Sequence, residues 1–180
     1  MNTATNNLEN DHIYITRLMD VMDKMSETRS SSITDFEKVV ILIKNYADGL
    51  HHAKEENLLF PMMISKGYSK EHGPVAVMLQ EHVTGREFVE GMAQAITLLK
   101  AGDEKGIDAV YKNFTGYTML LRNHIGKENN ILFRMADNVL TEADHNELLS
   151  KFAIVEESRI CGAVINEYIK DIESLEVAYL

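Results

Sequence analysis

Two short segments of the chain each place a histidine four residues before a glutamate. The first covers residues 51–56 (HHAKEE) and the second covers residues 124–128 (HIGKE). Residues four apart project from the same face of an α-helix, so each segment presents an imidazole and a carboxylate together. These side chains suit iron, zinc or manganese as metal ligands. The two segments therefore predict a metal site that is built from two helices.

The two segments also resemble each other beyond the histidine and the glutamate. Residues 54–62 (KEENLLFPM) align without gaps with residues 127–135 (KENNILFRM). The same alignment pairs His51 with His124. A repeated context of this kind favours a shared role for the two segments over a chance pair of surface residues.

The first segment offers two histidine–glutamate pairs at the same spacing, His51 with Glu55 and His52 with Glu56. The alignment places Glu55 opposite Glu128, which favours His51 and Glu55 as the pair in the site. His52 points about 100° away around an α-helix. We therefore expect His52 and Glu56 to lie at the edge of the site or on the surface.

Two further histidines lie on other predicted helices. His12 is the sole histidine of the first helix, and His82 lies midway along the third. Four helices thus each contribute one histidine, and two of them add a glutamate. A buried glutamate needs a metal ion or an ion pair, because an unpaired charge in the interior is costly. The combination predicts metal binding, although a single histidine or a single His-x-x-x-Glu pair more often has only a structural role.

The segments that must position these residues all have helical periodicity. Thr34 with Glu37, and Thr141 with Asp144, have the spacing of helix-capping boxes, and Pro74 is suited to a first helical turn. We predict five helices, over residues of about 8–27, 34–67, 74–102, 103–139 and 141–178.

Four long helices with short connections indicate an all-α fold, an antiparallel four-helix bundle. The length of 180 residues suits a single domain over 1–180, with a bundle core at about 8–139. An additional C-terminal helix at about 141–178 has an apolar stripe of its own. That helix can cap the bundle or form a homodimer contact, and the sequence does not decide between the two.

The composition argues against several classes of function. A net charge of -10 disfavours nucleic acid and anionic membrane surfaces as partners. No window reaches the roughly 18 apolar residues that a transmembrane helix needs, and the polar N-terminus lacks the pattern of a signal peptide. The single cysteine, Cys161, excludes an intrachain disulfide. We therefore expect a cytoplasmic protein.

These motifs resemble the hemerythrin-like family, also called HHE cation-binding domains. Residues 51–61 resemble the family's signature on its second helix, residues 73–82 that on its third, and residues 124–133 that on its fourth. The resemblance covers about residues 8–136. The chain is also similar to the metal-binding domain of bacterial di-iron proteins implicated in repairing damaged iron–sulfur clusters.

The resemblance implies a non-haem site for two iron ions with oxo or hydroxo and carboxylate bridges. It implies two bridging glutamates and two histidines on each iron: Glu55 and Glu128, then His12 with His51, and His82 with His124. Zinc or manganese would satisfy much the same ligands.

One feature departs from the family's pattern. Oxygen-carrying members use five histidines, two of them four residues apart on the third helix, whereas the neighbours of His82 at that spacing are Met78 and Arg86. No fifth histidine is evident, so both irons are short of six ligands. Tyr117 shares a helix face with His124 and offers a phenolate, although we expect it to be a structural residue.

Three functions remain open at this point. The first is binding of, or reaction with, dioxygen, hydrogen peroxide or nitric oxide in a stress response, rather than reversible oxygen carriage, with an electron donor that the sequence does not identify. The second is a non-enzymatic iron or oxygen sensor or reservoir that acts through a protein partner. The third is a metal-free structural bundle, and none of the three assigns a catalytic residue.

Overall fold

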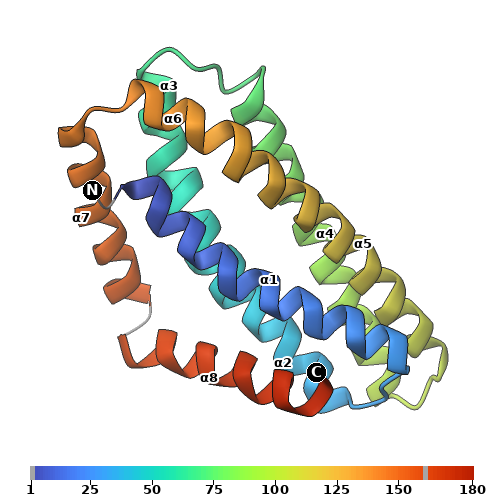
Figure 1. Cartoon of the computed structure of the whole chain (residues 1–180). Coiled ribbons are helices and arrows are strands. Elements are labelled where there is room, and N and C mark those ends of the chain that lie inside the picture. The colour runs from blue at the N-terminus through green and yellow to red at the C-terminus, as the bar shows by residue number, and fades with distance from the viewer. Residues whose placement is uncertain (1–2, 160–161) are drawn as a thin grey trace.

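The computed structural model describes residues 3–159 and 162–180, and the regular elements in those ranges are helices (Figure 1). Two of the four bundle helices are uninterrupted α-helices, α1 (Ala4–Thr28) and α4 (Pro74–Lys100). The predicted all-α bundle is confirmed. No helix within the described residues is both long and apolar enough to span a membrane.

The other two bundle helices contain π-helical stretches. One consists of α2 (Ile33–Leu42), η1 (Ile43–His52), η2 (Glu55–Leu59) and α3 (Phe60–Ser65). The other consists of α5 (Lys105–Lys127), η3 (Glu128–Leu132) and α6 (Phe133–Val139). The stretches η2 and η3 begin at the two glutamates that the sequence alignment pairs. Single π-turns inside α-helices occur frequently at functional sites.

The helix ends follow local capping chemistry, with one correction. The side chain of Ser32 accepts a hydrogen bond from the backbone N–H of Asp35, so the second bundle helix begins before Thr34 and the predicted Thr34–Glu37 capping box is wrong. The Thr141–Asp144 box is confirmed, because each side chain accepts a hydrogen bond from the other residue's backbone N–H at 2.8 and 3.3 Å. The first helix also begins earlier than predicted, at Ala4.

The C-terminal region contains two described helices where we predicted one over residues 141–178. These helices are α7 (Glu142–Arg159) and α8 (Gly162–Tyr179). Cys161 lies outside the described residues. Figure 1 shows both helices along the side of the bundle that α1 and α2 form. Arg17 of α1 donates two hydrogen bonds, at 2.5 and 2.7 Å, to the carboxylate of Glu176 in α8. The C-terminal helices thus cover the bundle.

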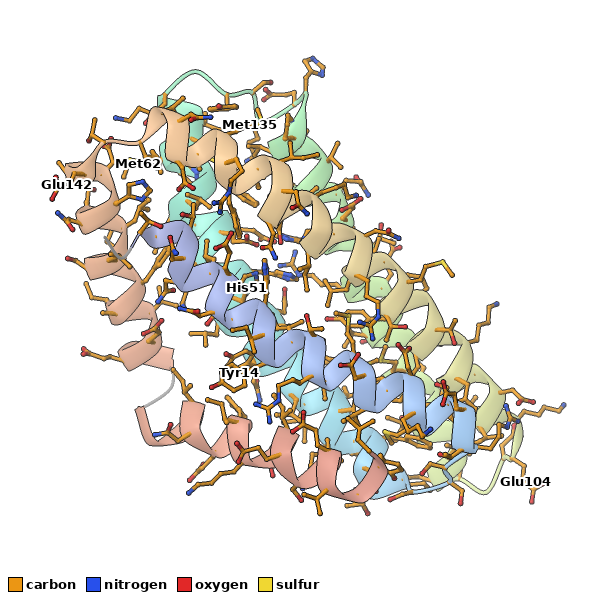
Figure 2. The ribbon with its side chains drawn as sticks, in the orientation of Figure 1. Tyr14, His51, Met62, Glu104, Met135 and Glu142 are labelled. Carbon is orange, nitrogen blue, oxygen red and sulfur yellow. The ribbon has the colours of Figure 1, made fainter. Side chains whose placement is uncertain are left out.

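The apolar core is divided into two clusters that lie toward opposite ends of the bundle. One contains Leu8 and Phe133, and the other contains Ile15 and Leu121. Each bundle helix contributes apolar residues to both clusters, and polar residues lie between these two apolar segments of the helix. A polar layer is therefore enclosed midway along the bundle, and Figure 2 places His51 in it.

Candidate metal centre

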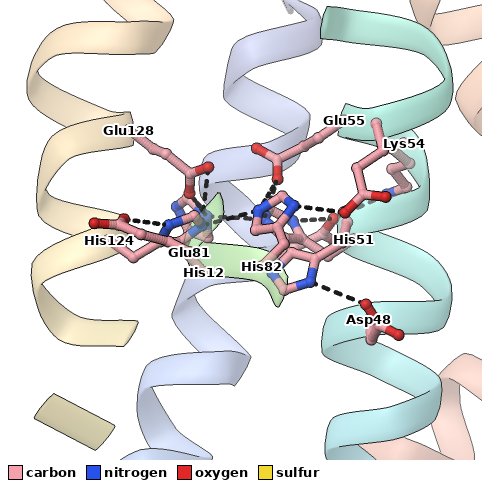
Figure 3. Close-up of polar contacts among 12 residues, drawn as sticks. His12, Asp48, His51, Lys54, Glu55, Glu81, His82, His124 and Glu128 are labelled. Carbon is pink, nitrogen blue, oxygen red and sulfur yellow. Dashed lines mark hydrogen bonds and ion pairs between the residues drawn. The ribbon is translucent and has the colours of Figure 1, made fainter. Parts of the chain in front are cut away.

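All six residues that the sequence singled out meet in this polar layer, and none is more than 3% exposed. Figure 3 shows the four histidines in one row, with both glutamates on the same side of it. They come from six elements of the four bundle helices: His12 in α1, His51 in η1, Glu55 in η2, His82 in α4, His124 in α5 and Glu128 in η3. Helical spacing within each segment is sufficient to bring the imidazole and carboxylate groups to one place.

The four histidines form two pairs that face each other through their inner nitrogens. The Nε2 atoms of His12 and His51 are 3.0 Å apart. Those of His82 and His124 are 3.1 Å apart. Each pair combines histidines from two helices that are neighbours in the chain.

The outer nitrogen of each histidine faces a hydrogen-bond acceptor on another helix, at 2.7 to 3.3 Å. The four contacts are His12 Nδ1 to Asn129 Oδ1, His51 Nδ1 to Asp11 Oδ2, His82 Nδ1 to Glu56 Oε1 and His124 Nδ1 to Glu81 Oε2. The acceptors of His51, His82 and His124 are carboxylates, which can only accept when ionised, so Nδ1 of these rings carries a proton. When such a ring is neutral, its Nε2 offers a lone pair. Two such lone pairs in contact repel unless a cation lies between them. This arrangement is typical of histidines that bind a metal.

The two glutamates connect the histidine pairs. Glu55 Oε2 lies 3.6 Å from His51 Nε2 and 3.4 Å from His82 Nε2. Glu128 reaches one histidine of each pair in the same way, with Oε2 at 3.2 Å from His12 Nε2 and Oε1 at 3.1 Å from His124 Nε2. Each carboxylate thus spans both pairs.

All four carboxylate oxygens of Glu55 and Glu128 are buried without a hydrogen-bond partner among the described residues. A buried charged group in that position is strongly destabilising unless something compensates it. A cation between the histidine pairs would compensate both carboxylates. The donor set of imidazole nitrogens and carboxylate oxygens fits two transition-metal ions.

The ionisable groups of the metal-free site perturb one another. Burial opposes protonation of His124, but the charge of Glu128 raises its pKa. Burial and the neighbouring charge of Glu128 raise the pKa of Glu55, because two carboxylates cannot both ionise easily at such a site. Burial also opposes ionisation of Glu128, but His124 and His12 beside it hold its pKa below the usual range. Burial and the nearby His12 lower the pKa of His51 to about 4, so its imidazole is neutral and able to bind a metal near pH 7.

His52 occupies a position that the sequence did not predict. It is buried, and its ring stacks on that of His82 with centroids 3.8 Å apart. Its Nδ1 lies 3.2 Å from Asp48 Oδ1. The expected surface position of His52 is therefore wrong, whereas Glu56 does lie at the edge of the site, where it contacts His82.

The potential ligand atoms fall into two groups that differ by His52. One group contains His12, His51 and Glu128; the other contains His52, Glu55, His82 and His124, with ligand atoms within 4.8 Å of one another. The structure thus brings a fifth histidine next to the other candidate ligands, although none was evident in the sequence. The π-helical stretch η1 accounts for the position of His52. A turn closed by i→i+5 hydrogen bonds contains more residues than an α-helical turn, so successive side chains are rotated by less than 100° around the helix axis.

The site has an internal two-fold repeat apart from His52. An acid–histidine dipeptide occurs on α1 (Asp11-His12) and again on α4 (Glu81-His82). In each half the acid faces Nδ1 of the histidine on the following helix, Asp11 that of His51 and Glu81 that of His124. The same acid also pairs with the lysine three residues after that histidine, which is Lys54 in the first half and Lys127 in the second. The acid before each histidine was the available sequence signal for these supporting residues. The counterpart of His52 in the repeat is Ile125.

A small cavity of about 20 Å³ adjoins the second group of ligands. His52, His82 and His124 line it, and most of the remaining wall is apolar: Ile43, Gly85, Val89, Tyr117, Leu120 and Leu121. This volume accommodates a molecule about the size of water. Burial raises the pKa of Tyr117, which disfavours a phenolate and agrees with the expected structural role.

An ion pair lies at the outer edge of this cavity. Arg86 of α4 approaches Asp48 at 2.6 Å and Glu56 at 2.7 Å. Arg86 therefore compensates the two carboxylates that hold the outer nitrogens of His52 and His82.

Comparison with known proteins agrees with these features. The hemerythrin HHE cation-binding domain matches residues 3–136. One similar protein is the iron–sulfur cluster repair protein YtfE of Cronobacter sakazakii (strain ATCC BAA-894), which is 35% identical over 88 residues. That alignment covers 48% of this chain and 40% of the YtfE protein, well under two thirds of its length. No solved structure is significantly similar to the chain.

Proposed function

Because the chain belongs to the hemerythrin HHE cation-binding family, we propose that it is a non-haem di-iron protein that reacts with dioxygen, hydrogen peroxide or nitric oxide under oxidative or nitrosative stress. One observation carries the proposal: Glu55 and Glu128 are buried with no hydrogen-bond partner in the described part of the chain, and each contacts one histidine of each pair. The name of the similar protein, which concerns iron–sulfur clusters, supports iron as the metal.

The proposed assignment follows the two groups of ligand atoms. His12 and His51 would hold one iron, His82 and His124 would hold the other, and Glu55 and Glu128 would bridge them. His52 would add a third imidazole on the side of His82 and His124. The two irons would then differ in their ligands, with two imidazoles on the side of His12 and His51 and three on the side of His82 and His124.

The bound irons would supply one-electron redox chemistry, and the chain would control access and orientation. The supporting acceptors fix each imidazole with Nε2 directed inward. The apolar clusters on both sides exclude bulk water from the layer. The cavity beside His82 has room for a small molecule, and its apolar wall favours a ligand without charge.

The experiment that tests this function measures turnover. Iron-loaded protein, reduced with ascorbate as a stand-in electron donor, is mixed with hydrogen peroxide, and in a second series with nitric oxide. We expect repeated consumption of at least one of them, and no consumption by a Glu55→Gln/Glu128→Gln variant that cannot hold iron. A stable, reversible dioxygen complex without turnover of either compound would contradict the proposal. Full iron loading with no reaction at all would favour the sensor or reservoir.

A further inference from the structure

A fully buried lysine lies beside the first histidine pair and is held partly by α7. The Nζ atom of Lys54 donates hydrogen bonds to Asn7 Oδ1 at 3.0 Å and to Asp11 Oδ2 at 2.9 Å, both on α1. It also lies 2.6 Å from Glu156 Oε1 of α7, in an ion pair. An ammonium group has three protons, so these three acceptors satisfy it completely. Its position above the ring of Phe152 adds a second contact with α7.

Asp11 connects this lysine to a proposed metal ligand. The same oxygen, Oδ2, accepts from Lys54 and lies 3.3 Å from Nδ1 of His51. Burial opposes ionisation of Asp11, but the hydrogen bond from His51 and the charge of Lys54 hold its pKa below the usual range. Asp11 is therefore a carboxylate that divides its charge between the ammonium and the imidazole.

The other half of the internal repeat contains the same chain of contacts without a helix such as α7. Lys127 pairs with Glu81, which in turn lies 2.9 Å from Nδ1 of His124. The side chain of Lys127 is 37% exposed, so water can complete its hydrogen bonds. Lys54 is 0% exposed, and the protein must supply the acceptor that water supplies in the other half. Glu156 is that acceptor.

We propose that α7 supports the metal centre, and that its residue Glu156 is a positioning residue which acts on His51 through Lys54 and Asp11. The inference rests on the metal site proposed above. It goes beyond the family match, because that match ends at residue 136 and α7 begins at Glu142.

The physical basis is charge compensation. With Glu156 in place, Lys54 is neutralised from two sides, and Asp11 keeps negative charge for the N–H of His51. That hydrogen bond fixes the ring and strengthens Nε2 as a donor. Without Glu156, Asp11 must neutralise Lys54 alone, and the support of His51 weakens. Loss of a residue that directly supports a metal ligand weakens metal binding by about 10–100-fold. Glu156 acts through two intervening residues, Lys54 and Asp11, so we expect about the lower end of this range.

The test compares the release of the two irons from wild type and from Glu156→Gln, which keeps the shape of the side chain and removes its charge. Both proteins are loaded anaerobically with ferrous iron enriched for Mössbauer spectroscopy, and a ferrous chelator is then added. We expect one iron to leave about tenfold faster than in wild type, with an altered Mössbauer component, while the other iron is unchanged.

Two controls separate positioning from a general effect on α7. Glu147→Gln removes an equal charge from the same helix, where Glu147 pairs with Lys151 at 2.6 Å on an exposed face, and its iron release should match wild type. Asp11→Asn interrupts the proposed connection. The double variant with Glu156→Gln should then release iron no faster than Asp11→Asn alone, because both changes act through one path.

The outcomes are distinct. Equal release from wild type and Glu156→Gln would overturn the inference and leave the di-iron site standing. Faster release of both irons together with a lower melting temperature of the metal-free protein, or additive effects with Asp11→Asn, would overturn it in favour of a purely structural α7. A wild type that binds no iron would overturn the proposed function itself, and the inference with it.

Discussion

His12 and His51 face each other through their Nε2 atoms at 3.0 Å, and each ring is held from outside by a hydrogen-bond acceptor. The same relationship recurs between the other two histidines. Unprotonated nitrogens at this distance repel without a cation, and the carboxylates between the pairs have no hydrogen-bond partner among the described residues. The metal-free protein therefore carries unfavourable energy in its interior, and several predictions depend on where that energy lies.

Replacing Glu55 with leucine should stabilise the metal-free protein. Burial and the charge of Glu128 raise the pKa of this carboxyl group, so the fold disfavours its ionised form. The substitution removes the group and keeps a similar volume, and we expect the free energy of unfolding to rise by about 1–3 kcal/mol. Wild type should gain stability from ferrous iron, by about 2.7 kcal/mol at a hundredfold excess over the dissociation constant, whereas Glu55→Leu should gain much less. Urea unfolding with and without iron measures both effects. A metal-free variant less stable than wild type would show that Glu55 has a structural partner.

Replacing His52 with isoleucine should make the two irons more alike. Isoleucine is the residue at the matching position of the repeat, Ile125, and removes only the proposed third imidazole. We expect the fold to be unchanged and the iron beside His82 to bind more weakly. The Mössbauer parameters of the two irons should become more similar. Unchanged spectra would exclude His52 as a ligand and return the site to four histidines.

The metal-free protein should lose stability as the pH falls from about 6.5 to about 4. His51 has a pKa of about 4 in the folded protein, whereas in the unfolded chain it is protonated below about 6.5. The unfolded state therefore binds more protons in this window, and acid favours it. The loss is on the order of 3 kcal/mol from this group. Unfolding curves of metal-free wild type and His51→Leu across this range isolate the effect, and parallel curves for the two proteins would contradict it.

Replacing Gly85 with alanine should raise stability and slow the reaction with small ligands. An added Cβ would lie 3.8 Å from Tyr117 and 3.9 Å from Leu120, at ordinary contact distance, and would occupy part of the cavity wall. Alanine also favours the helix by about 0.5–1 kcal/mol. Gly126→Ala is the matched control, since its Cβ meets no atom within 4 Å. Stopped-flow rates with nitric oxide should fall for Gly85→Ala only; equal rates for both variants would place ligand entry elsewhere.

The meeting of the six polar residues could be predicted because it depends on spacing within helices. Two residues four apart lie on the same helix face even when the predicted ends of the helix are slightly wrong. The repeat around His51 and His124 favours His51 and Glu55 as the pair in the site. The antiparallel bundle follows from the same periodicity. In contrast, the N-terminal cap at Ser32 was not predicted, because serine and threonine both cap helices and the Thr34–Glu37 spacing favoured the later start.

The misplacement of His52 has a different origin. Its burial depends on the π-helical hydrogen bonds of η1, which change the angle between successive side chains and leave no mark in the periodicity of apolar residues. The contacts of Lys54 with Asn7 and Glu156 were also beyond sequence reasoning. They join residues on different helices, up to 102 positions apart for Lys54 and Glu156, and depend on how each helix is rotated in the bundle.

The metal content of protein purified without a histidine tag tests the central claim most directly. Elemental analysis should find about two irons per chain, as expected for a carboxylate-bridged site in a helical bundle. The visible and near-ultraviolet spectrum should contain charge-transfer bands that shift when peroxide or azide is added. Protein that contains no iron, or a single zinc with a silent spectrum, and that takes up no ferrous iron under anaerobic conditions, would contradict the account.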